Sequence, residues 1–204
     1  MPDTALLIAG LGNPGVEYAR NRHNVGFMAA DVIADRYRFG PWKARFQGHV
    51  AEGVVVDRKV HLLKPMTYMN DSGLSVGTAM RFYKLPPEAL VVIHDEIDLA
   101  AGKLKVKTGG GDAGNNGLRS ITAALGPDYR RVRIGIGHPG EKSRVHKHVL
   151  GNFAKSDEDW LVAMLDAVAE AALFLARDDD AGFMNKVALM LHPPEKKPKP
   201  AKDA

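Results

Sequence analysis

The spacing of apolar residues along the chain predicts strands interleaved with helices. An apolar run at 6–9 ends in Gly10 and predicts a buried strand that opens into a loop. Between 25 and 37, apolar residues recur at helical spacing and predict an amphipathic helix. Two β-rich runs at 50–56 and 59–63 follow each other closely and predict an antiparallel hairpin. A sheet with only parallel strands is therefore not expected.

The alternation of strands and helices continues through the second half of the chain. Asn70 or Ser72 is expected to cap a helix that runs to about Tyr83. The other predicted elements are strands at 90–94, 103–108 and 131–137 and helices at 116–125, 157–176 and 182–191. Strands interleaved with helices, together with the hairpin, indicate an α/β fold: a single domain with a twisted mixed β-sheet flanked by helices.

Length and composition bound the domain organisation. The chain has 204 residues, of which 45% are apolar, and this is enough for one substantial core. We expect one domain at 1–192 and a disordered basic tail at 193–204, which is rich in Lys and Pro. No apolar run approaches the roughly 20 residues that cross a bilayer, and no secretory signal opens the chain. We therefore expect a cytoplasmic protein that does not span a membrane.

Charge and cysteine content narrow the chemistry only slightly. The formal net charge of +4 is modest for a protein that binds nucleic acid, so the placement of the basic residues matters more than their sum. Because the chain has no cysteine, disulfides and thiolate metal sites are excluded.

The glycine motif after the first predicted strand has two interpretations. Residues 10–15 read Gly-Leu-Gly-Asn-Pro-Gly and formally match the G-x-G-x-x-G pattern of dinucleotide-binding proteins. In that pattern the glycines open directly into a helix that receives the pyrophosphate. Here residues 16–24 are polar and a hairpin follows the first helix, so the context contradicts a dinucleotide site. A phosphate loop of the Walker A type is also excluded, because no Lys-Ser or Lys-Thr follows Gly15.

Six motifs occur in order along the chain, between about residues 6 and 185. They are Gly10-Leu11-Gly12-Asn13-Pro14-Gly15 with Tyr18, Arg22-His23-Asn24, Met69-Asn70-Asp71-Ser72-Gly73, His94-Asp95-Glu96-Ile97-Asp98, Gly109-Gly110-Gly111 with Asn116-Gly117-Leu118, and Arg133-Ile134-Gly135-Ile136-Gly137-His138-Pro139-Gly140. Together they resemble the motif set of bacterial-type peptidyl-tRNA hydrolases. The resemblance implies a monomer with a peptidyl-tRNA hydrolase-like fold, akin to that of phosphorylases, with no metal and no cofactor. The implied enzyme is a carboxylic ester hydrolase that cleaves the bond between a peptide and the 3′ end of tRNA.

The resemblance also assigns catalytic roles. Ester hydrolysis needs a base for water, a group that orients the base, and donors for the carbonyl oxygen. His23 would be the general base, and Asp95, just past the end of the predicted strand at 90–94, would orient it. Asn13 would help to distinguish a blocked amine from a free ammonium group. Without the resemblance, a lone loop histidine such as His23 is more often an ordinary surface residue than a base, and Asp95 could simply cap the next turn.

The same resemblance implies a binding surface for the acceptor stem and the 3′ CCA end of tRNA. Asn70 and Asn116 would hold the 3′ end and the peptide, and Tyr18 and Tyr68 would line the cleft. Lys107 and Arg133 would clamp the 5′ phosphate, which separates tRNA from other peptide esters. Further basic residues are expected to extend this surface; they are Arg119, Arg130, Arg131, Arg144 and Lys147. Each asparagine is equally explained by a loop or capping role.

One position departs from the family pattern. Asn115 stands where the family usually carries a histidine next to the following asparagine. Asn115 offers hydrogen bonds but does not titrate near neutrality, so we expect activity to survive with altered substrate binding. Two alternatives stay open at this point: an RNA-binding member of the same fold that no longer hydrolyses its ligand, and a purine-nucleoside-type phosphorylase.

Overall fold

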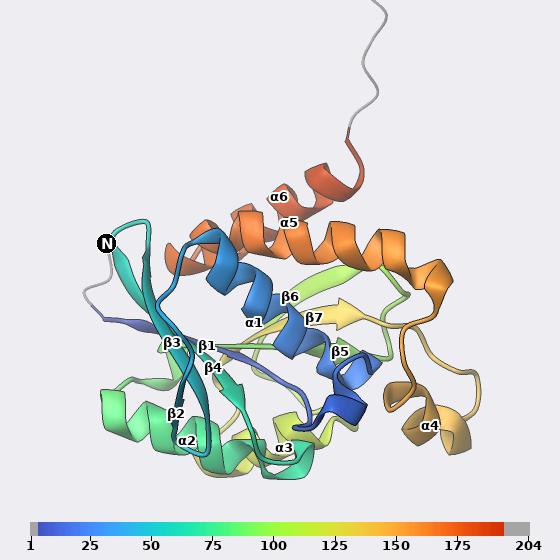
Figure 1. Ribbon diagram of the computed structural model, residues 1–204, viewed down its shortest axis with the longest axis horizontal. Helices are drawn as coiled ribbons and strands as arrows, with labels where there is room; N and C mark the ends of the chain where they lie inside the picture. The colour runs from blue at the N-terminus through green and yellow to red at the C-terminus, as the bar shows by residue number, and fades with distance from the viewer. Residues whose placement is uncertain (1–3, 194–204) are drawn as a thin grey trace, which may run out of the picture.

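A mixed sheet of seven strands lies at the centre of residues 4–193, the part of the chain that the computed structural model describes (Figure 1). The strands are β1 (Leu6–Gly10), β2 (Lys43–Arg45), β3 (Gly48–Val55), β4 (Arg58–Pro65), β5 (Leu90–Glu96), β6 (Leu104–Thr108) and β7 (Arg130–Gly135). They lie in the order β2-β3-β4-β1-β5-β7-β6. The four strands β4, β1, β5 and β7 are mutually parallel, whereas β3 pairs antiparallel with β2 and β4, and β6 pairs antiparallel with β7.

Helices cover both faces of this sheet (Figure 1). One face is covered by α1 (Val25–Arg36), α5 (Glu158–Ala176) and α6 (Asp180–Leu191), and the other by α2 (Ser72–Tyr83) and α3 (Asn116–Leu125). A short helix, α4 (Val145–Val149), lies near one end of the sheet. The 3₁₀ turns are η1 (Val16–Tyr18), η2 (Arg22–Asn24), η3 (Met69–Asp71), η4 (Pro87–Ala89), η5 (Lys142–Arg144) and η6 (Lys155–Asp157). Each helical layer buries its apolar face against the sheet, which gives two hydrophobic cores.

The predicted fold class and most of the predicted elements are confirmed. The antiparallel hairpin is present as β3 and β4, but its turn lies one residue earlier than expected, at Val56 and Asp57. Both turn residues have positive φ, as in the tight turns that match the twist of a hairpin. The last predicted strand is shorter than expected because the extended backbone ends before Gly137, whose φ is 74°. The predicted tail at 193–204 lies outside the described residues apart from Pro193.

Two local expectations are wrong. Neither Asn70 nor Ser72 caps α2: the helix continues out of η3, Asp71 occupies the N-cap position without a side-chain hydrogen bond, and the Ser72 hydroxyl donates to the carbonyl of Met69 at 2.7 Å. Asp95 does not follow the strand but belongs to it, since β5 extends to Glu96 and pairs with β7 from Val91 to Glu96. This end of the strand is polar, so the pattern of apolar residues does not predict its extended conformation.

Helix α1 packs closely against the sheet through two glycines. A Cβ atom on Gly10 would overlap the carbonyl group of Gly26, and a Cβ atom on Gly26 would overlap the Ile93 carbonyl oxygen and the backbone of Leu11. This close approach allows Leu11 N–H to donate to the Ile93 carbonyl at 3.0 Å and Phe27 N–H to donate to the Leu11 carbonyl at 3.2 Å. The first turn of α1 is therefore held against the ends of β1 and β5.

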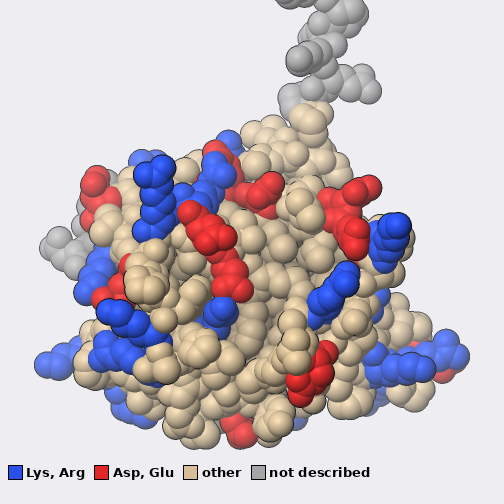
Figure 2. All heavy atoms as spheres, viewed as in Figure 1, with Lys and Arg blue, Asp and Glu red and all other residues tan. Residues whose placement is uncertain are grey.

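Charged side chains are dispersed over the surface seen in Figure 2. Lys and Arg side chains lie mainly toward the two sides of this face, with acidic side chains between them. Two of the arginines expected to extend a basic surface are buried instead: Arg130 is 6% exposed and Arg131 is 2% exposed. Among the described residues, no helix combines the length and the apolar character needed to cross a bilayer.

The close packing of α1 predicts a large difference between two helical glycines. Gly26→Ala should destabilise the protein by about 1–3 kcal/mol or more, because the backbone atoms that the methyl group meets are fixed by the sheet. Gly77→Ala in α2 is the matched control: its methyl group meets only the end of the Arg81 side chain at 3.3 Å and Ala124 at 3.6 Å. It should be neutral or stabilising by about 0.5–1 kcal/mol. Urea unfolding of both variants measures this, and equal destabilisation would contradict the assigned role of Gly26.

Candidate active site

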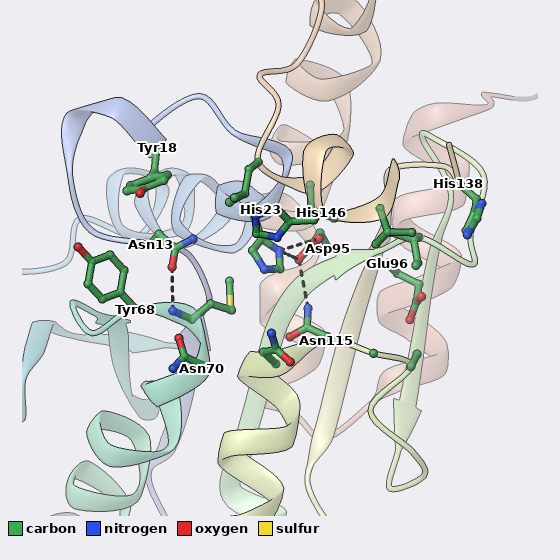
Figure 3. A pocket seen from close by; sticks show the side chains of 18 of the residues that line it. Asn13, Tyr18, His23, Tyr68, Asn70, Asp95, Glu96, Asn115, His138 and His146 are labelled. Carbon is green, nitrogen blue, oxygen red and sulfur yellow. Dashed lines mark hydrogen bonds and ion pairs between the residues drawn. The ribbon is translucent and has the colours of Figure 1, made fainter. Parts of the chain in front are cut away.

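A cavity of about 620 Å³ opens at the end of the sheet where β1 and β5 finish (Figure 3). In α/β sheets this is where ligand-binding groups are usually presented. The cavity brings together side chains from segments that are far apart in the sequence, including eight predicted site residues. These eight are Asn13, Tyr18, His23, Tyr68, Asn70, Asp95, Asn115 and Asn116.

His23 and Asp95 form a close and largely buried polar contact in the cavity. The Nδ1 atom of His23 lies 2.9 Å from each of the two carboxylate oxygens of Asp95. Their side chains are 12% and 2% exposed, respectively. Because a carboxylate only accepts hydrogen bonds, Nδ1 carries the proton in the neutral ring, and Nε2 is left with a lone pair that can accept a proton. The geometry is that of a base and its orienting group.

Burial and charge act in opposite directions on His23. Desolvation by burial lowers the pKa of His23, but the negative charge of Asp95 and its hydrogen bond to Nδ1 raise this pKa by a larger total amount. The resulting pKa of His23 lies above the ordinary value of histidine. His23 therefore holds a proton more firmly than an exposed histidine does, and its base form becomes dominant only at a correspondingly higher pH.

The segment that carries His23 is fixed by residues from much later in the chain. Asn21 forms an isolated antiparallel bridge with Asn152, and their side chains share a hydrogen bond of 2.8 Å. Arg22 N–H donates to the carbonyl of Gly151 at 3.0 Å, and the Arg22 guanidinium pairs with Asp157 at 3.3 Å. These contacts hold η2 from one side while α1 holds it from the other.

The side-chain amide of Asn13 has a defined orientation. Its Oδ1 accepts a hydrogen bond from Met69 N–H at 2.7 Å, so its NH₂ group is the end that is left for the cavity. The backbone of Asn13 is held in turn by Asn24, whose side chain accepts from Asn13 N–H and donates to the Asn13 carbonyl, both at 2.9 Å. Asn13 is therefore a fixed donor that can face a carbonyl oxygen.

Asn115 and Asn116 enter the cavity at the start of α3. The Oδ1 atom of Asn115 accepts from Leu118 N–H at 3.1 Å and caps the helix, while its Nδ2 donates to Asp95 Oδ1 at 3.3 Å. The Oδ1 atom of Asn116 accepts from Arg119 at 3.2 Å, which leaves its NH₂ group free of described partners. Asn115, at the position that departs from the family pattern, thus contacts the same carboxylate as His23.

Tyr18, Tyr68 and Asn70 lie at the opposite side of the cavity from Asn115 (Figure 3). Tyr68 is 60% exposed at the start of η3, and Tyr18 is half-buried in η1. Asn70 is exposed and belongs to η3. An exposed tyrosine ring at a cavity rim can stack on an unpaired base.

Lys107 and Arg133 do not line this cavity. They line a neighbouring cavity of about 270 Å³, and Glu96 and Ala113 border both cavities. Arg133 Nε donates to the buried carboxylate of Glu96 at 3.0 Å, so part of its charge is already compensated. Lys107 is exposed, without a hydrogen-bond or ion-pair partner among the described residues. The two residues predicted to bind phosphate therefore lie together in a second, adjacent cavity.

Sequence reasoning missed several residues of these cavities. Asn24 and Glu96 lie within the quoted motifs, but nothing in their spacing shows that one supports Asn13 and the other pairs with Arg133. His138, Lys142 and His146 line the main cavity from the segment around η5 and α4, which has no apolar periodicity to mark it. Within residues 4–193, no group of three or more His, Asp or Glu side chains is arranged as metal ligands.

Comparison with known proteins identifies the family. The profile of the peptidyl-tRNA hydrolase family matches residues 7–198. The chain belongs to the peptidyl-tRNA hydrolase family. Two relatives named peptidyl-tRNA hydrolase illustrate the similarity: that of Parvibaculum lavamentivorans is 60% identical over 95% of this chain and 96% of its own length, and that of Acidiphilium cryptum is 62% identical over 90% and 96%.

Solved structures of the family share the fold. The crystal structure of peptidyl-tRNA hydrolase from Acinetobacter baumannii is 43% identical, covers 90% of this chain and 94% of its own, and superimposes with a TM-score of 0.85. A purine nucleoside phosphorylase from Toxoplasma gondii superimposes with a TM-score of 0.53 at 9% identity. At that identity the likeness concerns the fold alone and gives no support to phosphorylase chemistry.

The opposing effects of burial and of the Asp95 charge on His23 lead to a testable prediction about the pKa of this histidine. The negative charge of Asp95 and its hydrogen bond to Nδ1 both raise the pKa of His23, and Asp95→Asn removes the two together. Burial remains, so this pKa should fall below the value of about 6.5 typical of an exposed histidine. A pH titration of the His23 ring by NMR measures it. Glu96→Gln removes a neighbouring carboxylate that does not contact His23 and should leave the titration in place. A His23 pKa that does not move in Asp95→Asn would contradict the assigned cause.

Proposed function

We propose that this member of the peptidyl-tRNA hydrolase family cleaves the ester between an N-blocked aminoacyl group, such as a peptide, and the 3′ end of tRNA, with His23 as the general base and Asp95 as its orienting group. The observation that carries the proposal is the contact of His23 Nδ1 with Asp95 at 2.9 Å inside a cavity lined by carboxamides. Free tRNA and a free peptide are the products.

The reaction follows from the groups that face the cavity. His23 Nε2 takes a proton from a water molecule as the water oxygen attacks the ester carbonyl carbon. The carbonyl oxygen gains negative charge, and the NH₂ groups of Asn13 and Asn116 are donors that can face it or the neighbouring peptide amide. When the bond to the ribose oxygen breaks, the imidazolium of His23 returns the proton to this oxygen. Asp95 stabilises the imidazolium while it exists.

Substrate selection is assigned to three groups of residues. Asn13 hydrogen-bonds the amide of a blocked amino group, and a free ammonium group leaves it without a matching partner. Asn70 and Asn116 hold the 3′ end and the peptide. Tyr18 and Tyr68 stack against the 3′ CCA end, and Lys107 with Arg133 binds the 5′ phosphate in the adjacent cavity. Asn115 supports Asp95 and has one remaining N–H for the substrate. Phosphate contacts place the acceptor stem without reading its sequence, so many tRNAs are substrates.

We further propose that the enzyme acts as a monomer, without a metal or cofactor, in the cytoplasm, where translation releases peptidyl-tRNA. The His23 imidazole accounts for both proton transfers in the proposed reaction, while Asp95 and the carboxamides stabilise the charges that develop. The alternative of an RNA-binding protein without hydrolytic activity is suggested mainly by Asn115, which stands where a histidine is expected. The contact between Asn115 and Asp95 weakens that argument, because Asn115 supports the carboxylate that orients His23 in the proposed reaction.

Removal of the His23 imidazole should strongly lower turnover while tRNA binding persists. His23→Ala should lower kcat on N-acetylated aminoacyl-tRNA by about 10²–10⁴-fold, the share that a positioned base contributes, with tRNA affinity changed only a few-fold. His49→Ala is the matched control, since this histidine lies on β3 and does not line the cavity. Unchanged turnover in His23→Ala would remove His23 from the role of base. Binding of tRNA by the unmodified protein without hydrolysis would instead support the RNA-binding alternative.

The assignment of the 5′ phosphate to the second cavity leads to a separate prediction about the affinity for tRNA. Lys107→Ala should weaken binding of tRNA and reduce the slope of log affinity against log salt by about one. Because the cation contacts the 5′ phosphate, the loss should be larger for tRNA that carries this phosphate than for dephosphorylated tRNA. Lys186→Ala on α6 is the matched control, since it lies on the opposite face of the sheet. Equal losses with both tRNAs would contradict the assignment of the 5′ phosphate to this cavity.

A further inference from the structure

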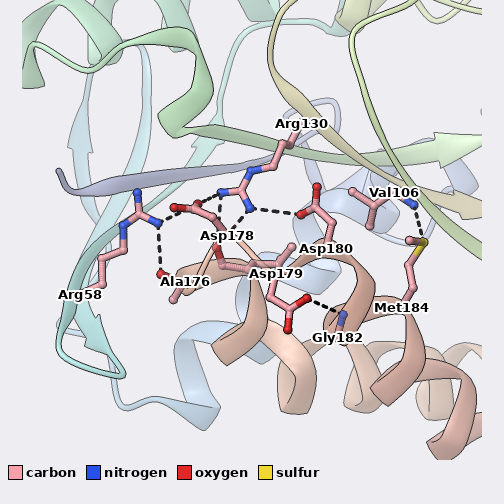
Figure 4. Close-up of polar contacts among 10 residues, drawn as sticks. Arg58, Val106, Arg130, Ala176, Asp178, Asp179, Asp180, Gly182 and Met184 are labelled. Carbon is pink, nitrogen blue, oxygen red and sulfur yellow. Dashed lines mark hydrogen bonds and ion pairs between the residues drawn. The ribbon is translucent and has the colours of Figure 1, made fainter. Parts of the chain in front are cut away.

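Two neighbouring arginines on β7 are both buried but point to opposite faces of the sheet. Arg130 is 6% exposed and faces the turn between α5 and α6, where it pairs with Asp178 at 2.7 Å and with Asp180 at 3.1 Å (Figure 4). Arg131 is 2% exposed and lines the second cavity together with His94 and Gly111. The role of Arg130 is to fasten a helical turn, whereas Arg131 contacts a segment that borders the active site.

Arg131 is a poor contributor to stability by its own contacts. Its Nη1 donates to the carbonyl of Gly111 at 2.7 Å, and its Nη2 lies 3.9 Å from Asp112. Its Nε and Nη2 atoms have no hydrogen-bond partner among the described residues, and its guanidinium lies 4.6 Å from the centre of the Tyr129 ring. Burial of a guanidinium with so few partners is costly. The bond to Gly111 is the one hydrogen bond that the Arg131 guanidinium makes among the described residues.

The segment that Arg131 holds has little to fix its conformation. Gly109, Gly110 and Gly114 have positive φ, and so does Ala113 at 47°. A Cβ atom on Gly111 or on Gly114 would meet nothing within 4 Å, so packing does not restrain these positions. A glycine-rich segment without packing loses much conformational freedom on ordering. A side-chain contact to its backbone, such as that of Arg131 to Gly111, therefore contributes to its position.

This segment leads directly to the catalytic carboxylate. Asn115 N–H donates to the carbonyl of Asp112 at 2.8 Å, and the Asn115 side chain donates to Asp95 at 3.3 Å. Asp112 is held a second time by Thr122, whose hydroxyl donates to its carboxylate at 3.1 Å. A continuous set of contacts thus runs from Arg131 through residues 111–115 to Asp95, and from Asp95 to His23.

We propose that Arg131 is a positioning residue for the hydrolysis: by holding the Gly111 carbonyl, it places Asn115 so that its amide orients the carboxylate of Asp95. The inference rests on the proposed function. Arg131 does not line the cavity that holds His23 and Asp95, and it acts on these groups through Asn115. Its loss lowers turnover because Asp95 then no longer holds His23 in the productive orientation, and misplacement of a catalytic group by about 1 Å costs up to about 100-fold in rate.

A double-mutant cycle tests this path. Arg131→Met removes the guanidinium, keeps an unbranched side chain of similar reach, and should lower kcat on N-acetylated aminoacyl-tRNA by about tenfold. Asn115→Ala should have an effect of similar size. If Arg131 acts through Asn115, the double variant should be slower than the slower single variant by no more than about twofold. Two effects that multiply, to about a hundredfold, would overturn the proposal.

Arg130→Met is the matched control, with the same substitution one residue earlier on the same strand. It should lower the Tm at least as much as Arg131→Met, because it breaks two ion pairs. Its kcat should stay within about twofold of the parent enzyme at a temperature where both variants are folded. A tenfold loss of kcat in Arg130→Met would mean that general loss of stability explains both results.

Arg131→Lys keeps the test falsifiable if the methionine variant does not fold. Its ammonium group can still donate to the Gly111 carbonyl, so kcat should lie between those of the parent enzyme and Asn115→Ala. A kcat equal to that of Asn115→Ala, in a folded Arg131→Lys, would show that a single donor to Gly111 is not sufficient and would contradict the proposal.

A readout without substrate separates this inference from the proposed function. The side-chain amide resonances of Asn115 in ¹⁵N NMR spectra should shift or broaden in Arg131→Met and remain in place in Arg130→Met. If the parent enzyme does not hydrolyse N-acetylated aminoacyl-tRNA, the proposed function fails. If the parent enzyme is active and the Asn115 signals are unchanged in Arg131→Met, only the role of Arg131 fails.

Discussion

The close approach of α1 to the ends of β1 and β5 is the constraint on which the active site depends. Two facing glycines, Gly10 and Gly26, allow the helix backbone to touch the strand backbone, where any side chain would hold the two apart. His23 lies in the turn immediately before this helix, and Asp95 lies on the strand that Leu11 contacts through Ile93. A wider spacing between helix and sheet would separate the imidazole from the carboxylate, which now lie 2.9 Å apart.

The site also illustrates how burial and charge combine. Desolvation alone would lower the pKa of His23 and make it a weak base, but Asp95 reverses this effect and raises the pKa. Asp95 tolerates its own burial because the ring nitrogen of His23 and the amide of Asn115 donate to it. Asn115 is neutral, so it contacts Asp95 without adding a group that titrates near neutral pH.

Much of the architecture could be predicted from the sequence, because it follows from the local spacing of apolar and polar residues. The strand at β1, the helix α1, the hairpin and the limits of α3 follow from apolar spacing. The polar end of β5, the short turns η1 and η2, and helix α4 carry no such periodicity and escaped prediction. The motifs located His23, Asp95 and the carboxamides, but no local pattern shows which of two adjacent arginines faces the active-site segment. That distinction follows from the side of β7 on which each side chain lies, and it needs the three-dimensional structure.

The support of the His23 segment by Asn152 and Asp157 has a consequence for the synthesis of the enzyme itself. The partners that fix Asn21 and Arg22 lie between 126 and 135 residues further along the chain. While the ribosome makes this protein, the unfinished polypeptide is joined to tRNA by the same kind of ester that the family hydrolyses. A copy that has not yet emerged as far as Asp157 lacks the contacts that hold its imidazole in place. Newly made chains therefore complete the contacts around His23 only late in their own translation.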